Sequence, residues 1–164
     1  MEGRKQIERQ VVIQASQDTV WRVLSDSRLI ADWVPAVREV ESCSLEGEGE
    51  GAVRTCSVEL TGKVGKMVER CVEFTPRSRI AYLVDEESFG MRRMFQHYGF
   101  ALNVRSEGED MTRVVLETHY TPKNVFYAFL NAMMMRRQFT KVCEGIVQGL
   151  KRYVEGLSEV RVEG

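Results

Sequence analysis

The chain has 164 residues, 43% of them hydrophobic and 29% charged, and its formal net charge is −1 at pH 7. These values are typical of one globular domain, which at this length buries roughly 70% of its extended surface, so we expect a single domain over residues 1–164. Because Lys and Arg are scattered along a nearly neutral chain, the composition argues against the concentrated basic face of a nucleic-acid-binding protein.

The N-terminal part of the sequence predicts a strand followed by two short helices. Residues 5–15 alternate between apolar and polar side chains, which is typical of a strand with one buried face. Ser16 stands at an N-cap position before an apolar helical repeat, and Ser27 stands before a second repeat that reaches Trp33. Pro35 disfavours helix at the preceding residue, so the chain should leave this region extended.

From Val37 to Tyr120 the sequence predicts six strands joined by short turns. The turn signals are the glycine-rich stretch EGEGEGA at 46–52, Thr61-Gly62, Thr75-Pro76, the loop SFGM at 88–91, and Gly108. Closely spaced strands of this kind favour a meandering antiparallel sheet. With the first strand, the sheet has seven strands.

From Lys123 to near Gly156 the sequence predicts one long helix. At 100° per residue, a single apolar stripe passes through Ala132, Phe139 and Leu150. With a rise of roughly 1.5 Å per residue, such a helix is long enough to cross the whole sheet.

Membrane, disulfide and metal signals are weak. No apolar run reaches the roughly 20 residues of a membrane span, and residues 1–10 lack the apolar region of a signal peptide, so we expect a cytoplasmic protein with no transmembrane segment. The four cysteines show no Cys-x-x-Cys spacing, which favours buried thiols over a disulfide framework. His97 and His119 could meet on neighbouring strands, but no third ligand is visible, and we expect neither a metal nor another cofactor.

The order of the elements and two longer motifs carry a family resemblance. The stretch VVIQASQDTVWRVLSDSRLIADWVPAVREVE resembles the opening of the polyketide cyclase/dehydrase-like branch of the SRPBCC (START-like) superfamily. The later stretch VERCVEFTPRSRIAYLV resembles that family's glutamate-bearing strand, its proline-centred turn and its next strand. The resemblance covers nearly the full chain.

The resemblance implies an α+β helix-grip fold. In that fold a seven-stranded curved antiparallel sheet surrounds a long C-terminal helix, and two short helices lie between strands 1 and 2. It also implies an apolar cavity between sheet and helix, with the short helices closing one wall. Members of the superfamily differ widely in function, so the fold alone leaves the function open.

Strand alternation selects the residues expected to line this cavity. Val64, Val68 and Val72 share the alternation of Arg70, so Arg70 rather than Glu69 is expected to face inward and to need a carboxylate partner. Arg136 lies at the edge of the helix stripe and either extends to solvent or pairs with an anionic ligand group. The full expected lining is Trp33, Val58, Leu60, Val68, Arg70, Tyr82, Val84, Gln96, Tyr98, Phe100, Leu102, Leu116, Thr118, Tyr120, Phe129, Ala132, Met135, Arg136 and Phe139.

Three phenols among these residues are candidates for catalysis. Tyr82, Tyr98 and Tyr120 are expected to face an apolar space, where a phenol needs a hydrogen-bond partner. That partner is either a bound ligand, or another of these phenols, Gln96 or water. As a general base, a phenol would need a pKa well below its usual value near 10.

The segment VFYAFLNAMMM, residues 125–135, is apolar nearly all round the helix. Leu130 and Met134 point away from the stripe that faces the sheet. An apolar back face of this kind requires cover, and three explanations remain open: a gate at the cavity mouth, a homodimer contact, or a surface that touches a membrane.

The sequence therefore favours the binding or transport of a small hydrophobic ligand, such as a lipid, an isoprenoid or a polyketide-like aromatic. The first alternative is a polyketide cyclase/dehydratase-type enzyme that uses acid–base chemistry without a metal. The second alternative is a protein-interaction module that acts through the apolar helix face at 125–135.

Overall fold

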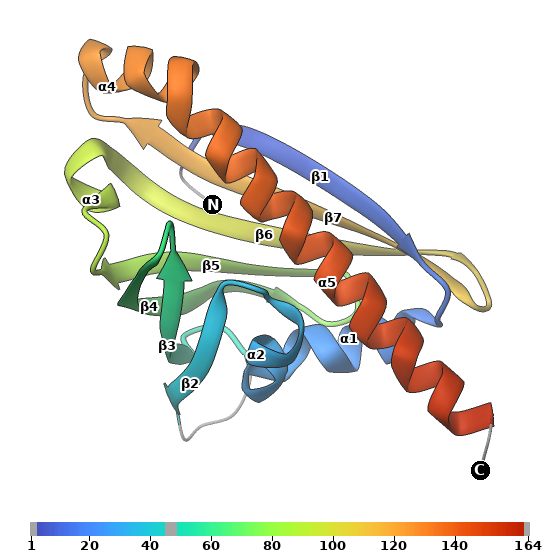
Figure 1. The fold of residues 1–164 in the computed structure, drawn as a ribbon. Helices are drawn as coiled ribbons and strands as arrows, with labels where there is room; N and C mark the ends of the chain where they lie inside the picture. Colours follow the sequence, from blue (N-terminus) through green and yellow to red (C-terminus); the bar gives the residue numbers. More distant parts are fainter. Residues whose placement is uncertain (1–2, 45–48, 163–164) are drawn as a thin grey trace.

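The computed structural model describes residues 3–44 and 49–162, with side chains to residue 157, and contains one antiparallel sheet with a long helix across one face (Figure 1). The strands are β1 (Lys5–Ile13), β2 (Val37–Cys43), β3 (Val53–Leu60), β4 (Lys63–Thr75), β5 (Arg79–Glu87), β6 (Phe95–Gly108) and β7 (Met111–Pro122). The helices are α1 (Gln17–Ser25), the 3-10 helix η1 (Ser27–Leu29), α2 (Ile30–Trp33), α3 (Met91–Met94), α4 (Val125–Leu130), the π-helical turn η2 (Asn131–Met135) and α5 (Arg136–Val162).

The sheet has seven strands in the order β1-β7-β6-β5-β4-β3-β2, and every neighbouring pair is antiparallel. This arrangement confirms the predicted α+β class with a seven-stranded sheet, a C-terminal helix and short helices between the first two strands. The predicted turn EGEGEGA lies partly outside the described residues. None of the described helices is both long and apolar enough to span a membrane.

The short helices α1 and η1 begin at side-chain caps. The Ser16 hydroxyl accepts a hydrogen bond from the Thr19 backbone N–H, as an N-cap does. The cap of the second helical segment is Asp26 rather than the expected Ser27, because the Asp26 carboxylate accepts from the Arg28 N–H while Ser27 is buried. Val34 is extended before Pro35, as predicted.

The core lies between the sheet and α5. Val147, Leu150 and Val154 of α5 are fully buried, with relative exposures of 0%. Gly149 brings α5 close to α2, because a Cβ at this position would lie only 2.1 Å from the Trp33 carbonyl oxygen. A glycine is therefore needed where the helix meets the wall that contains Trp33.

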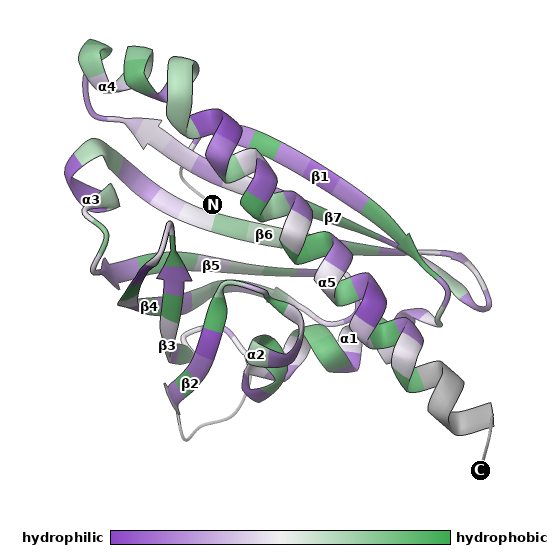
Figure 2. Ribbon diagram, viewed as in Figure 1, coloured by the Kyte–Doolittle hydropathy of each residue, from purple (hydrophilic) through white to green (hydrophobic). Residues whose placement is uncertain are grey.

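The C-terminal helical segment is not one regular helix. The π-helical turn η2 separates α4 from α5. Its hydrogen bonds join residues five apart, so it holds more residues than a turn of α-helix. α4 lies beyond the end of β7, and most of its residues are hydrophobic (Figures 1 and 2). At the other end, the helix continues past the predicted end near Gly156 to Val162.

Candidate functional site

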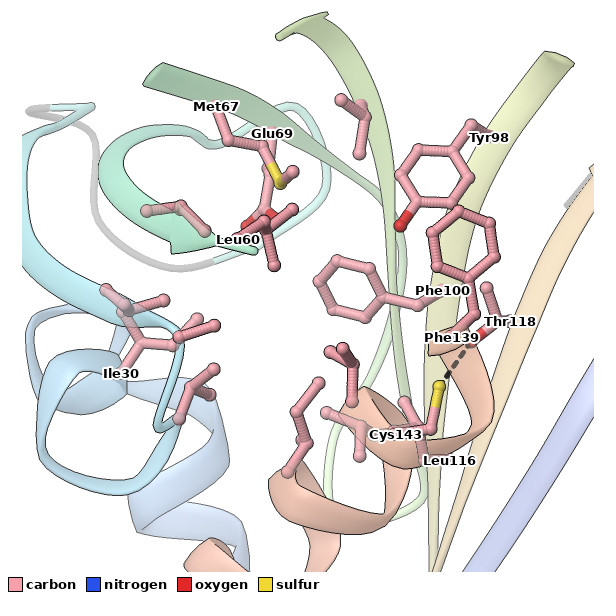
Figure 3. Close-up of a pocket in the computed structure, with 18 of the residues that line it drawn as sticks. Ile30, Leu60, Met67, Glu69, Tyr98, Phe100, Leu116, Thr118, Phe139 and Cys143 are labelled. Atoms are coloured by element: carbon pink, nitrogen blue, oxygen red, sulfur yellow. Dashed lines mark hydrogen bonds between the residues drawn. The ribbon is translucent and has the colours of Figure 1, made fainter. Parts of the chain in front are cut away.

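A cavity of about 180 Å³ lies between the sheet, α2 and α5 (Figure 3). Apart from Thr61, Glu69, Tyr98, Thr118 and Gln138, its lining is apolar. The lining residues are Ile30, Trp33, Val34, Ala36, Val37, Val58, Leu60, Thr61, Met67, Glu69, Val84, Tyr98, Phe100, Leu102, Leu116, Thr118, Gln138, Phe139, Val142, Cys143 and Ile146.

Many of the residues expected at the cavity do line it. They come from α2, from strands β3, β5, β6 and β7, and from α5. These residues are Trp33, Val58, Leu60, Val84, Tyr98, Phe100, Leu102, Leu116, Thr118 and Phe139. The structure therefore brings together side chains from elements far apart in the sequence.

The facing of β4 differs from the prediction. Met67, Glu69 and Cys71 are buried on the inner face, whereas the Arg70 side chain is 42% exposed and pairs with Asp85 at 2.8 Å. Val68 shares the outer facing of Arg70 and does not line the cavity. The prediction took the face of Val64, Val68 and Val72 as the inner one, but Val64 is 65% exposed, and Glu69 is accommodated in the interior by a buried cationic partner.

That partner is Arg54, which lies directly opposite Glu69 in the β3–β4 ladder. The Arg54 Nε donates to the Glu69 Oε2 at 2.7 Å, and the two side chains are only 3% and 7% exposed. The Arg54 guanidinium also lies 4.0 Å from the centroid of the Tyr82 ring, within the range of a cation–π contact. Burial alone lowers the pKa of Arg54, but the adjacent Glu69 carboxylate, together with Tyr82 and Cys56, outweighs this effect and raises that pKa above its ordinary value.

Sequence reasoning missed Glu69, although a signal for it was present. Counting outward from the predicted turn at Thr61-Gly62 pairs Leu60 with Lys63 and, six residues further along each strand, Arg54 with Glu69. Opposite charges at paired positions in a hairpin stabilise one another. The pairing could therefore have been read from the sequence, but not that the pair is buried.

Gln96 is exposed rather than inward-facing. The β6–β7 register shifts between Gln96 and Gly99, where His97 has a positive φ of 54°. A β-bulge adds a residue to one strand and so reverses the alternation beyond it. As a result Phe95 on one side of the bulge and Tyr98 on the other both face inward.

The first part of the C-terminal helical segment also departs from the prediction. Phe129, Ala132 and Arg136 are exposed, and Met135, although half-buried against the core, does not line the cavity. The π-helical turn changes the phase of the helix, so that Asn131 rather than Ala132 faces the sheet. The apolar stripe predicted from a uniform helix therefore applies only from Phe139 onward.

Two of the three predicted phenols lie outside the cavity lining. Tyr82 is buried beneath Arg54 and stacks on Phe100 with ring centroids 5.5 Å apart. Tyr120 is fully buried, and its hydroxyl donates to the Asn131 Oδ1 at 2.8 Å. Burial raises the pKa of Tyr120 to about 12, so this phenol stays protonated at neutral pH.

Tyr98 is the predicted phenol that does face the cavity, and Figure 3 shows its hydroxyl pointing into the space. Burial raises the pKa of Tyr98 well above its usual value. The group is therefore a hydrogen-bond donor and acceptor at neutral pH rather than a general base.

A second polar contact lies on the helix side of the cavity. The Thr118 hydroxyl and the Cys143 thiol are 3.2 Å apart and are both buried. Burial also raises the pKa of Cys143, which keeps the thiol protonated and removes the thiolate that a nucleophilic cysteine needs.

The predicted histidines lie away from the cavity. The His119 ring contacts the Gly3 carbonyl oxygen at 3.1 Å and the Glu117 carboxylate at 3.3 Å, and His97 lies in the β6 bulge. Within the described part of the chain, no three side chains of His, Cys, Asp or Glu are grouped so that they could hold a metal ion.

Comparisons with known proteins agree with the fold. Residues 4–155 match a family model described as polyketide cyclase/dehydrase and lipid transport, and no curated protein sequence matches significantly. Among solved structures, a START superfamily protein from Mycobacterium smegmatis superposes with a TM-score of 0.70 at 17% identity, over 92% of this chain and 97% of that chain.

Two enzymes are also among the similar structures. A norcoclaurine synthase point mutant from Thalictrum flavum, in complex with a transition-state analogue, has a TM-score of 0.71 at 18% identity, over 93% of this chain and 94% of that chain. The Zhui aromatase/cyclase from Streptomyces sp. R1128 has a TM-score of 0.64 at 22% identity, over 95% of this chain and 94% of that chain. At these identities the likeness shows a shared fold.

Proposed function

The chain belongs to the polyketide cyclase/dehydrase and lipid transport family, and we propose that it binds and carries one compact hydrophobic ligand in the cavity between the sheet and α5. The observation that carries this proposal is the cavity itself, which is lined by apolar side chains from strands, α2 and α5. Apolar cavities with a few converging polar groups are the usual form of small-molecule sites.

The size of the cavity favours a ligand of one or two rings. An apolar cavity of about 150 Å³ accommodates benzene, and pockets for drug-sized ligands occupy roughly 300–1,000 Å³. At about 180 Å³, this cavity is close in volume to the one that accommodates benzene. Among the expected ligand classes, a polyketide-like aromatic therefore fits better than a lipid with long acyl chains.

Binding is favoured over acid–base turnover by the state of the cavity groups. Burial raises the pKa values of Tyr98 and Cys143, so neither supplies a base or a nucleophile at neutral pH. Cyclase/dehydratase chemistry would then depend on the Glu69 carboxylate, one oxygen of which is already engaged by Arg54.

A cavity-filling variant tests the proposal. 2-Methoxynaphthalene is used as an uncharged two-ring probe, with affinity measured by fluorescence titration. Val142→Trp places a large side chain into the cavity from α5 and should weaken binding at least tenfold. The matched control is Val64→Trp on the outer face of β4, where the native side chain is 65% exposed and the probe affinity should not change. No binding to the wild-type chain, or equal binding to both variants, would contradict the proposal.

We also propose that residues 125–135 form a contact with a second copy of the chain. Val125, Phe126, Phe129, Met133 and Met134 are each at least 60% exposed, whereas Leu130 is half-buried. In a twofold dimer the same apolar surface is presented by both copies, so each covers the other. Such cover removes the exposed apolar face from water.

Sedimentation velocity tests this contact. The double variant Phe129→Glu/Met134→Glu should sediment as a monomer at concentrations where the wild type is a dimer. A monomeric wild type would contradict the proposal, and co-sedimentation of that monomer with anionic phospholipid vesicles would assign the surface to a membrane instead.

A further inference from the structure

We infer that the cavity selects hydrophobic ligands that carry an uncharged hydroxyl group, which binds between the Glu69 carboxylate and the Tyr98 hydroxyl. This inference rests on the proposed function and adds a chemical class to it. It depends on three observations: a buried charge in an apolar cavity, two polar groups there with hydrogen-bonding capacity that the described residues do not use, and the neutrality of the ion pair.

Glu69 is a buried carboxylate that borders the cavity. The residue is 5% exposed, and it lies among the lining residues with Met67 and Leu60 (Figure 3). Within residues 3–44 and 49–157, the hydrogen bond from Arg54 to Oε2 is the only one made by its side chain. A carboxylate has about four acceptor positions, so Glu69 retains acceptor capacity toward the cavity.

Tyr98 supplies the complementary group. Its hydroxyl points into the same cavity and makes no hydrogen bond to any side chain or backbone group of the described residues. A phenol can both donate and accept. In the proposed complex, the ligand hydroxyl lies between these two groups, donates its proton to Glu69 and accepts a hydrogen bond from Tyr98.

The charge balance of the site disfavours charged ligands. Arg54 and Glu69 neutralise one another at 2.7 Å, and both are buried. A ligand carboxylate would lie near the Glu69 carboxylate in a low-dielectric cavity, which is unfavourable for both. A ligand ammonium would add an uncompensated charge, because Glu69 already neutralises Arg54.

Arg54 acts in this site as a positioning residue. Its guanidinium is held over the Tyr82 ring at 4.0 Å and fixes one oxygen of Glu69. A buried ion pair contributes little net stability compared with apolar residues of similar volume, because desolvation offsets the attraction. Replacing both members by apolar residues should therefore preserve the fold while removing the hydroxyl-binding group.

Three naphthalene probes test the inference by isothermal titration calorimetry at about pH 7, where a phenol is uncharged. 2-Naphthol carries the hydroxyl, 2-methoxynaphthalene lacks the donor, and 2-naphthoate carries a carboxylate. Because a hydrogen bond to a charged group contributes strongly in a buried site, 2-naphthol should bind about ten- to a hundredfold more tightly than the ether. 2-Naphthoate should bind more weakly than the ether.

Variants assign the preference to specific side chains. Arg54→Met/Glu69→Leu should bind the ether at least as well as the wild type but lose the preference for 2-naphthol. Tyr98→Phe should reduce the preference severalfold without affecting the Arg54–Glu69 pair. The matched control is Arg70→Gln/Asp85→Asn, which removes an Arg–carboxylate pair from the outer face of the same sheet and should leave the preference unchanged.

The outcomes separate the inference from the proposed function. Equal affinities for 2-naphthol and its methyl ether would overturn the inference and leave the proposed function standing. The inference would also be overturned if the Arg54→Met/Glu69→Leu variant and the Tyr98→Phe variant both kept the full preference for 2-naphthol over its methyl ether. Binding of none of the three probes would contradict the proposed function, and the inference with it.

Discussion

The two halves of the C-terminal helical segment are both rich in apolar residues but lie in opposite environments. In α5, Val147, Leu150 and Val154 are completely buried against the sheet, whereas Val125 and Phe126 of α4 are 86% and 68% exposed. The difference arises because α4 lies beyond the end of β7, where none of the described strands covers it (Figure 1). Apolar content alone therefore does not determine burial; the position of the segment relative to the sheet does.

The two halves meet at the π-helical turn η2. Asn131, its first residue, is buried and accepts a hydrogen bond from the fully buried Tyr120 hydroxyl. This contact attaches the start of the turn to β7. Residues that follow the turn face the sheet in a different phase from those that precede it.

The largest expected difference between the halves is in core packing. Leu150→Ala should lower the free energy of unfolding by about 2–5 kcal/mol, because it leaves a cavity at a fully buried position. Phe129→Ala in α4 removes a larger side chain that is 63% exposed in the single chain, and at protein concentrations where the chain is a monomer it should change the free energy of unfolding by less than about 0.5 kcal/mol. Urea unfolding monitored by circular dichroism measures the free energy of unfolding of both variants. Similar losses of stability in the two would refute the comparison.

A glycine pair tests how closely α5 approaches its neighbours. Gly149→Ala should cost about 1–3 kcal/mol, because the new Cβ would lie 2.1 Å from the Trp33 carbonyl oxygen and would force the helices apart. Gly156→Ala meets no atom within 4 Å and should stabilise the helix by about 0.5–1 kcal/mol. If both variants are stabilising, α5 does not pack on α2 as described.

The contact at the π-helical turn can be removed by deleting a single oxygen. Tyr120→Phe leaves the buried Asn131 side chain without its donor and should cost about 1–3 kcal/mol in the free energy of unfolding. Tyr127→Phe, in the half-buried part of α4, is the matched control and should have little effect. Hydrogen exchange of the amides of residues 131–135 should increase in the first variant alone.

Alkaline pH should also weaken the fold at the same contact. Burial raises the pKa of Tyr120 to about 12 from an ordinary value of 10.0. Because the folded state holds this proton more tightly than the unfolded state, its contribution to stability is complete below about pH 10 and is lost as the pH rises through about 12. Melting temperatures measured from pH 9 to pH 12 should fall less steeply for Tyr120→Phe than for the wild type. Parallel curves would show that Tyr120 does not contribute.

The sequence by itself determined the order of the seven strands, the short helices that follow β1 and the C-terminal helical segment. Alternation predicted the seven strands, the serine before α1 predicted its cap, and the family motifs indicated the helix-grip arrangement. It also contained the pairing of Arg54 with Glu69, since the turn at Thr61-Gly62 sets the register of the hairpin. These features depend on local spacing, which a sequence records directly.

Only the tertiary structure decided which residues face the cavity. The inner face of β4 includes Glu69 because a partner on the neighbouring strand compensates its charge, and charge compensation is a property of two strands together. The bulge at His97 and the π-helical turn at 131–135 each shift the phase of an otherwise regular element. Such shifts follow from how the sheet and the helix segments pack on one another, so that local periodicity cannot reveal them.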